Sequence, residues 1–294
     1  MIRHVRRVTA TCALGALALG LAGCGETASS GVPGATRSAG IPESSPKPKT
    51  TVTPRPSARP TLAPGPGGTT PVFERGAATE GRTVALTFDA DMTADQGARA
   101  RAGERFDNPQ LIRTLRKLKV PATVFMTGRW AEEYPAEARD IGRDRLFEVA
   151  NHSYSHYAFT GDCYGLPGVP ERGMRADVDR AFGAFRKAGV EHVVPYFRFP
   201  GGCYDRAALR ALAPTGVTAV QWDVVSGDAF ATDADAVTQQ VLDGVRPGSV
   251  VVMHCTRSAA PTTERVVRAV VPRLRAKGYR FVRVSDLVGA ARGA

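Results

Sequence analysis

The feature that most constrains the fold is a regular alternation of short apolar segments with amphipathic ones from about residue 83 onward. Helix-period patterns separate these short segments, and this alternation predicts a parallel α/β sheet or a (β/α) barrel. About seven such units favour the barrel over a flat sheet. The segments expected to be strands are 83–88, 122–126, 146–150, 196–199, 217–222, 249–253 and 280–284.

The expected helices have recognisable ends. Asn108 followed by Pro109 marks a helix start, because proline suits the first helical position. A second helix is expected to end near Gly189, and a third to cover 234–242. A fourth apolar stripe covers 266–274, and Pro272 is expected to disturb that helix.

Residues 1–24 predict an export signal. Three arginines precede an apolar run that is shorter than the ~20 residues needed to span a bilayer. The run ends in Leu-Ala-Gly-Cys, which resembles the lipobox of bacterial lipoproteins, with Cys24 as the lipidated residue. The alternative is an ordinary cleaved signal peptide with an incidental cysteine. The lipoprotein interpretation places the protein on the outer face of the cell membrane, held by its lipid anchor.

Residues 25–78 predict an extended, disordered tether that could reach the cell wall. They are rich in Pro, Ser, Thr and Gly and show no hydrophobic period.

More than half of the net charge of +11 lies in the N-terminal part of the chain, because residues 1–70 hold eight Lys and Arg against two Asp and Glu. The folded domain, expected at 79–294, is only mildly basic. Since no recognition motif accompanies the charge, nucleic acid is not an expected partner.

Polar residues follow the predicted strands. In parallel α/β folds the carboxyl ends of the strands meet at one edge, where ligands bind. The segments that follow these strands are Asp89-Ala90-Asp91, 151–156, 198–202, 222–228 and His254.

His152 and His156 stand four residues apart. On a helical turn this spacing places both imidazoles on one face, as metal ligands require. Taken alone, the pair is a weak signal, because this spacing is more often two polar loop residues. A carboxylate from another strand end would complete a catalytic Zn²⁺ site, in which three protein ligands leave room for water. His254, at the end of a buried strand, is either a satisfied core residue or a catalytic one, and the surrounding cluster favours catalysis.

Five segments together carry a family resemblance: T-F-D-A-D, N-H-S-Y-S-H, R-F-P-G-G, W-D-V-V-S-G-D and V-M-H. In this order and spacing they resemble the motifs of the NodB-homology polysaccharide deacetylases, carbohydrate esterase family 4. The resemblance extends from Thr83 to about Leu287. It implies a distorted (β/α) barrel that uses a divalent metal, commonly Zn²⁺, to remove N- or O-acetyl groups from glycans.

The resemblance also implies a role for individual residues. Asp89 matches the general base, and Arg198 the residue that pairs with it. His254 matches the general acid, oriented by Asp228, and the backbone N–H of Gly201 matches the oxyanion donor. The metal-binding histidines are matched by His152 and His156.

The chain departs from the family pattern at three places. Ala90 stands where the family has a metal-binding Asp, so Asp91 is the expected third ligand; the alternative is a site with two histidines and an extra water. Ala229 stands where the family often has a Trp, so Trp222 or Tyr204 is expected to line the acetyl pocket. The insert 92–107 is longer than usual, and either shapes the substrate groove or is a solvated loop.

Three cysteines remain beyond the signal and anchor: Cys163, Cys203 and Cys255. Export favours one disulfide and one free thiol, and three pairings are possible. Cys163–Cys203 is favoured, because both residues lie in loops that should border the site.

The leading hypothesis is therefore a monomeric cell-surface N-deacetylase acting on an N-acetylated polysaccharide, with peptidoglycan or another N-acetylglucosamine polymer as substrate. The alternatives are an O-acetyl esterase on a xylan-like polymer and a catalytically impaired glycan-binding lipoprotein. Ala90 motivates the last of these.

Overall fold

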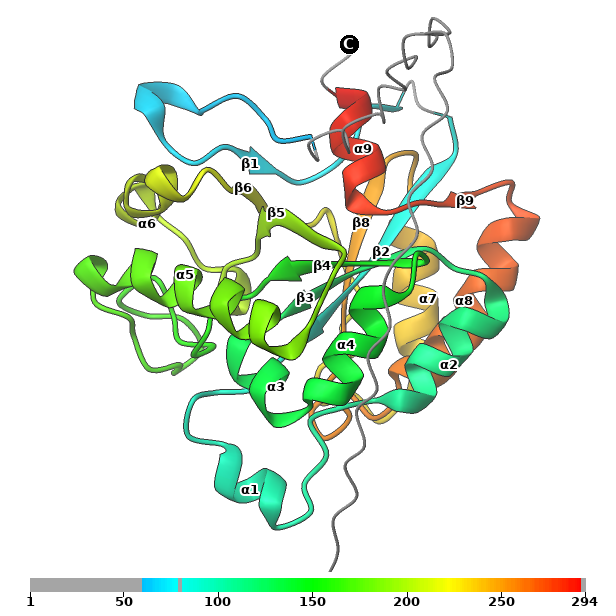
Figure 1. Cartoon of the computed structure of the whole chain (residues 1–294). Helices are drawn as coiled ribbons and strands as arrows, with labels where there is room; N and C mark the ends of the chain where they lie inside the picture. The colour runs from blue at the N-terminus through cyan, green and yellow to red at the C-terminus, as the bar shows by residue number, and fades with distance from the viewer. Residues whose placement is uncertain (1–59, 79–80, 292–294) are drawn as a thin grey trace, which may run out of the picture. The chain divides into compact units, whose positions relative to one another are not determined.

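The computed structural model describes residues 60–78 and 81–291, so the signal, Cys24 and most of the tether lie outside the described residues. The described chain forms one sheet of parallel strands, in the order β1-β6-β5-β4-β3-β2-β8-β7, with β9 paired to β2 (Figure 1). The strands are β1 (Val72–Phe73), β2 (Thr83–Ala90), β3 (Ala122–Met126), β4 (Phe147–Asn151), β5 (Val193–Phe197), β6 (Thr218–Val220), β7 (Val224–Val225), β8 (Ser249–His254) and β9 (Arg280–Phe281).

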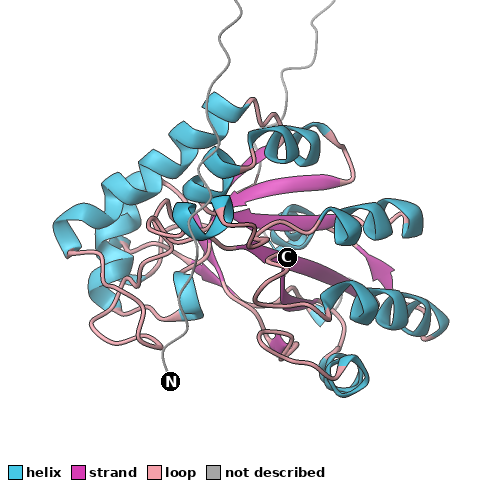
Figure 2. Ribbon diagram, turned by 90° about the horizontal axis from the view of Figure 1, so that it is seen from below, coloured by secondary structure: helices cyan, strands magenta, loops and turns pink. Residues whose placement is uncertain are grey.

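Helices connect the strands and surround them when the molecule is seen from below (Figure 2). Among the described residues, no helix combines the length and the apolar character that crossing a bilayer requires. The helices are α1 (Gly97–Arg101), α2 (Pro109–Leu118), α3 (Gly128–Glu133), α4 (Pro135–Arg143), α5 (Glu171–Ala188), α6 (Arg206–Leu212), α7 (Ala234–Gly244), α8 (Thr263–Ala276) and α9 (Val284–Ala291).

This architecture confirms the barrel-type fold, with corrections to its parts. The sheet has nine strands rather than about seven, because β1 and β7, of two residues each, were not expected. The last expected strand shrinks to β9, and α9 begins where that strand was expected to end. Pro272 does not break α8, because it lies on the exposed face, where water can bond the carbonyl that it leaves free.

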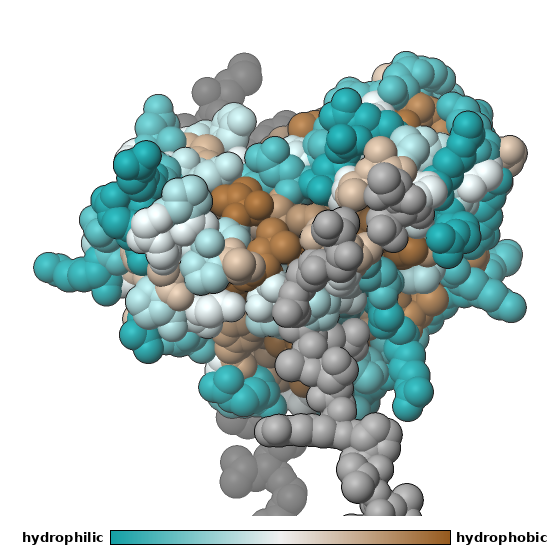
Figure 3. Space-filling model, turned by 90° about the horizontal axis from the view of Figure 1, so that it is seen from above, coloured by the Kyte–Doolittle hydropathy of each residue, from teal (hydrophilic) through white to brown (hydrophobic). Residues whose placement is uncertain are grey.

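The end of the sheet at which the strands begin is closed by α9 (Figure 1). The N–H of Val284 donates to Thr123 Oγ1, and that of Ser285 to Glu148 Oε1. These contacts anchor the helix to the second residues of β3 and β4, and Leu287 packs on the apolar side chains inside the sheet. Seen from this end, hydrophilic side chains form much of the periphery and apolar surface gathers toward the middle (Figure 3).

Residues 60–78 pack on the sheet, which differs from the expected tether. Val72 and Phe73 pair with β6, and Phe73 is buried. Beyond them, Arg75 bridges to Ser249 of β8, and the N–H of Gly76 donates to Gly248 O. This segment therefore spans the gap between β6 and β8 that would otherwise open the barrel. Burial of Phe73 and partial burial of Val72, both β-prone residues, offset part of the cost of ordering a proline-rich segment.

Glu137 on α4 predicts a pH dependence of stability. Burial is the largest cause that raises its pKa to about 8, and neighbouring Asp107 adds to it. Because the unfolded chain ionises nearer 4.5, the native state loses stability as the pH rises from about 4.5 to about 8. In Glu137→Gln we expect the fall in the free energy of unfolding over this pH range to be smaller by about 1–2 kcal/mol, a figure that allows for the partial solvent exposure of Glu137.

Urea unfolding at pH 5 and at pH 8.5 measures this effect. The wild-type free energy of unfolding should fall more between the two pH values than that of Glu137→Gln. The exposed Glu171 supplies a control, since Glu171→Gln should keep the wild-type dependence. Identical pH dependence of wild type and Glu137→Gln would contradict the assignment.

Candidate active site

The polar residues predicted from the sequence meet at the carboxyl edge of the sheet. Asp89 and Asp91 lie at the end of β2, and His152 follows β4. Arg198 follows β5, and His254 ends β8. Since β5, β4, β3, β2 and β8 are successive neighbours and all parallel, their ends lie at one edge, the lower edge in Figure 1.

Asp91, His152 and His156 form a cluster with the composition of a metal site. One potential ligand atom from each lies within 4.8 Å of the other two. Asp91 Oδ1 is 3.2 Å from His152 Nε2 and 3.4 Å from His156 Nε2. This oxygen is buried and has no hydrogen-bond partner among the described residues. A buried carboxylate oxygen between two imidazole nitrogens fits a divalent cation, and two histidines with one carboxylate suit Zn²⁺.

The two histidines converge through a loop rather than the expected helical turn. Ser153 and His156 both have a positive φ, of 68° and 55°. The loop is held by its own polar contacts, because Ser153 N donates to Asn151 Oδ1 and His156 N donates to Ser153 Oγ. His152 Nδ1 lies 2.9 Å from Arg198 O, which fixes the ring with Nε2 toward the cluster.

Burial and mutual charge set the protonation of the cluster. Burial alone would raise the pKa of Asp91, but His156, His152 and His254 together hold that pKa well below its usual range. Burial lowers the pKa of His156 to about 4 and outweighs the attraction of Asp91. Burial also opposes the charged form of His152, but Asp89 and Asp91 raise its pKa. These pKa shifts favour the metal-binding forms of Asp91 and His156, a carboxylate and a neutral imidazole, whereas His152 would release its proton when a metal binds.

Asp89 lies beside this cluster and is paired with a fully buried arginine. Arg198 Nη1 donates to Asp89 Oδ1 at 2.6 Å, and the guanidinium also donates to Val220 O and Gln221 O. Its carbon Cζ stands 3.9 Å from the ring centre of Phe125. The other oxygen, Asp89 Oδ2, lies 3.7 Å from His152 Nε2. One oxygen of the carboxylate is therefore fixed by Arg198, and the other faces the cluster.

His254 reaches the cluster from β8, the strand that pairs with β2 on the side away from β3. Its Nδ1 lies 2.8 Å from Asp228 Oδ1, and its backbone N–H donates to Asp228 Oδ2. Burial would lower its pKa, but Asp228 raises that pKa to about 10. His254 Nε2 lies 3.9 Å from Asp91 Oδ2. The ring is thus held at one nitrogen and presents the other to the site.

Two residues that support Asp228 were not found from the sequence. Ser226 Oγ donates to Asp228 Oδ1 at 2.9 Å, and Thr263 Oγ1 donates to Asp228 Oδ2 at 2.6 Å. Ser226 could have been inferred, since a serine hydroxyl often accepts from the backbone N–H two residues on, as Ser226 Oγ does here from Asp228. Thr263 is 35 positions away, and no sequence pattern indicates its contact.

These groups open into one cavity of about 580 Å³. Gly201 and Trp222 line it as expected, whereas Tyr204 is absent from its lining and instead stacks on Phe199. The insert 92–107 contributes to the wall rather than lying apart in solvent. The insert residues that line the cavity are Thr93, Gln96, Arg99, Glu104 and Phe106.

The disulfide joins Cys163 to Cys203, the favoured pairing, with Cα atoms 5.9 Å apart. Cys255 is a buried free thiol. The bond fixes the loop after His156 to the segment after Gly201. A Cβ added at Gly201 would come within 2.6 Å of Cys163 Sγ. The positive φ of Gly201, 65°, also requires glycine there.

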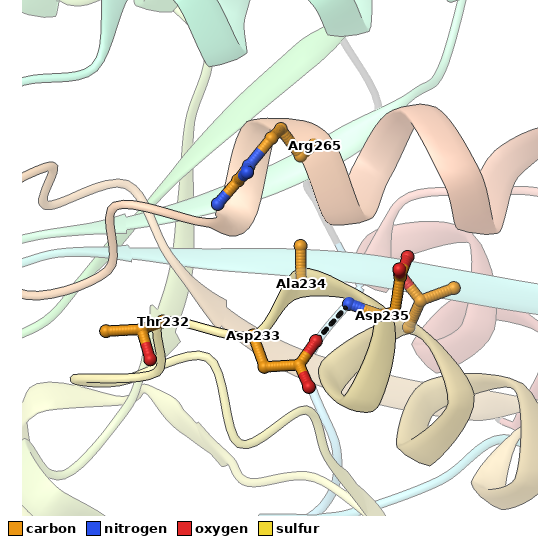
Figure 4. Close-up of a pocket in the computed structure, with 6 residues that line it drawn as sticks. Thr232, Asp233, Ala234, Asp235 and Arg265 are labelled. Carbon is orange, nitrogen blue, oxygen red and sulfur yellow. Dashed lines mark hydrogen bonds between the residues drawn. The ribbon is translucent and has the colours of Figure 1, made fainter.

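A second cavity, of about 430 Å³, lies beside the start of α7 and has different chemistry (Figure 4). Asp233 caps the helix by accepting from the N–H groups of Asp235 and Ala236, and Arg265 extends toward it from α8. Its lining holds neither histidine nor cysteine. His192 lies just before β5, at the opposite end of the strands from the active site.

Known proteins share both the sequence pattern and the fold. Residues 76–220 match the polysaccharide deacetylase family. A chitooligosaccharide deacetylase of Azorhizobium caulinodans is 28% identical over 187 residues, covering 58% of this chain and 83% of that protein. A peptidoglycan-N-acetylglucosamine deacetylase of Bacillus cereus is 28% identical over 206 residues, covering 69% of this chain and 67% of that protein.

A solved structure agrees on the fold. The Bc1960 peptidoglycan N-acetylglucosamine deacetylase superposes with a TM-score of 0.62 at 24% identity, over 74% of this chain and 92% of that one. The solved structure shows the shared fold, and the family match together with the deacetylase relatives shows that residues 76–220 belong to the polysaccharide deacetylase family.

Proposed function

We propose that the protein is a metal-dependent N-deacetylase of an N-acetylglucosamine polymer at the cell surface, with peptidoglycan as the substrate. The observation that carries this proposal is the cluster of Asp91, His152 and His156, flanked on either side by Asp89 and His254 within one cavity. Asp91 then takes the place of the ligand missing at Ala90. We further propose that the bound ion is Zn²⁺.

A divalent ion held by these three residues would supply Lewis-acid polarisation of the acetyl carbonyl. Asp89 Oδ2 faces the cluster and is the base that accepts the proton of the attacking water. Arg198 holds the opposite oxygen, so that the carboxylate keeps this direction. The backbone N–H of Gly201, at the cavity wall, is the donor that we assign to the developing oxyanion.

The second half of the reaction falls to His254. As the C–N bond breaks, its Nε2 donates a proton to the departing nitrogen, and Asp228 holds Nδ1 so that Nε2 keeps its direction. The oxygen of water ends in acetate, and the sugar ends with a free amine. Trp222 closes the wall beside the acetyl group.

The place of action follows from the N-terminal segments and is part of the proposal. Lipidation at Cys24 would hold a monomeric enzyme at the outer face of the membrane, and the proline-rich segment would extend it toward the wall. The names of the relatives, which act on chitooligosaccharide and on peptidoglycan N-acetylglucosamine, support a glycan with N-acetyl groups.

Substrate choice is tested by giving the purified protein peptidoglycan and, separately, acetylated xylan. We expect peptidoglycan to yield acetate and free sugar amines in equal amounts. Acetate from xylan alone would support an O-acetyl esterase and contradict the proposal. Binding to peptidoglycan without acetate from either polymer would instead indicate a glycan-binding protein.

A further inference from the structure

The exposed large hydrophobic side chains of the described chain are concentrated at one place. Tyr164, Val225 and Phe230 are its exposed large hydrophobic residues, and all three line the active-site cavity. The two rings are the most exposed, at 87% and 83%. Isolated exposed apolar residues are normal on a surface, but their concentration around one cavity indicates a binding function.

Both rings are also held in an unfavourable backbone conformation. Tyr164 has a φ of 52° and Phe230 a φ of 59°, in the left-handed region that bulky residues rarely adopt. Such strain persists only where the surroundings enforce it, and it is common at ligand-binding sites. A solvent-exposed ring gains little burial in return, so folding stability does not explain these two residues.

The surroundings of each ring enforce its position. Tyr164 follows the disulfide-bonded Cys163, and its ring lies near Gly201. Phe230 follows Ala229, and its N–H donates to Ala259 O at 2.6 Å. The two loops precede α5 and α7, so the rings reach the cavity from separate parts of the fold.

The rest of the cavity wall combines apolar and hydrogen-bonding groups. Trp222 and Leu166 add apolar surface, while Gln96, Arg99 and Ser258 offer donors and acceptors. A pyranose ring has the matching chemistry, because its C–H faces are apolar and its rim carries hydroxyl groups. Aromatic rings beside polar side chains therefore suit a chain of sugars better than a purely apolar ligand.

We propose that Tyr164 and Phe230 are stacking platforms for the sugar units next to the one that is deacetylated. This inference rests on the proposed function and names the residues by which the site would favour oligomers and polymers over single N-acetylated sugars. The strained loops place the rings before substrate arrives, so binding needs little further ordering.

The test replaces each ring with glycine, which adopts a positive φ without strain. For Tyr164→Gly and Phe230→Gly we expect the KM for an N-acetylglucosamine pentamer to rise roughly three- to tenfold each. The melting temperature should stay level or rise, because the strain is relieved. Loss of affinity without loss of stability is a result that a structural role would not give.

Lys119 provides the matched control. It is an exposed residue with a φ of 51° at the end of α2, away from the cavity, so Lys119→Gly relieves the same strain. This variant should leave the KM unchanged. Tyr164→Phe and Phe230→Tyr, which keep a ring, should also keep the wild-type KM.

Calorimetric binding of the same pentamer separates this inference from the proposed function. The glycine variants should bind it more weakly than wild type, whether or not acetate is released. Wild type that binds but releases no acetate would sink the deacetylase proposal alone. Equal pentamer affinity in wild type and both variants, or no binding by wild type, would overturn the stacking proposal.

Discussion

Replacing Asp89 with asparagine is expected to lower kcat for acetate release by about a hundred- to ten-thousandfold. Asparagine keeps the size of the side chain and can still accept the bond from Arg198, but it cannot accept a proton from water. The KM should change little, because the carboxylate acts on the reacting water and its loss leaves the sugar contacts in place.

Some stability should be lost as well, since Arg198 is fully buried and would keep its charge without the ion pair. The assay therefore belongs well below the melting temperature of the variant. Asp233→Asn is a matched control, because it makes the same change at the cap of α7, where asparagine caps a helix about as well as aspartate, and leaves the active site untouched. An Asp89→Asn variant with more than a tenth of wild-type kcat would contradict the assignment of the base.

The second large effect is expected at Asp91. Asp91→Ala should weaken Zn²⁺ binding by more than about a hundredfold. Loss of a residue that only orients a metal ligand costs at most about that much, so a larger effect indicates a ligand. Acetate release should fall with it and recover only in part at high Zn²⁺. Metal content after dialysis and competition with a chelating dye measure the affinity directly.

The direction of the strand explains why Asp91 and not position 90 supplies the ligand. Successive side chains of β2 point to opposite faces, so Asp89 and Asp91 share the face that carries the site. Ala90 instead packs with Phe88 in the largest apolar cluster. A carboxylate at position 90 would enter this core. Unchanged Zn²⁺ affinity in Asp91→Ala would contradict this account and favour a site made by the two histidines.

Much of this fold could be predicted because it depends on local patterns. The strands from Thr83 and from Ser249 are almost uninterrupted apolar runs, as parallel strands covered on both faces require. Strands of two residues, such as β1 and β7, carry no comparable signal, since their pairing depends on neighbours far along the chain. For the same reason nothing in the sequence marked Val72 and Phe73 as part of the sheet.

The candidate site divides in the same way. The positions of Asp89, His152 and His254 at strand ends could be inferred, because strand ends meet in any parallel fold. The left-handed backbone at His156 could not, since it depends on polar contacts within its own loop. The sequence also could not show that Tyr204 lies outside the cavity lining, because this follows from its stacking on Phe199.

Acetate release from the N-acetylglucosamine pentamer, with and without chelator, tests the central claim most directly. The purified protein should release acetate and free amine in equal amounts. A chelator should abolish this release, and added Zn²⁺ should restore it. A chain that holds one Zn²⁺ and binds the pentamer, yet releases no acetate, would contradict the claim that these residues form a deacetylase centre.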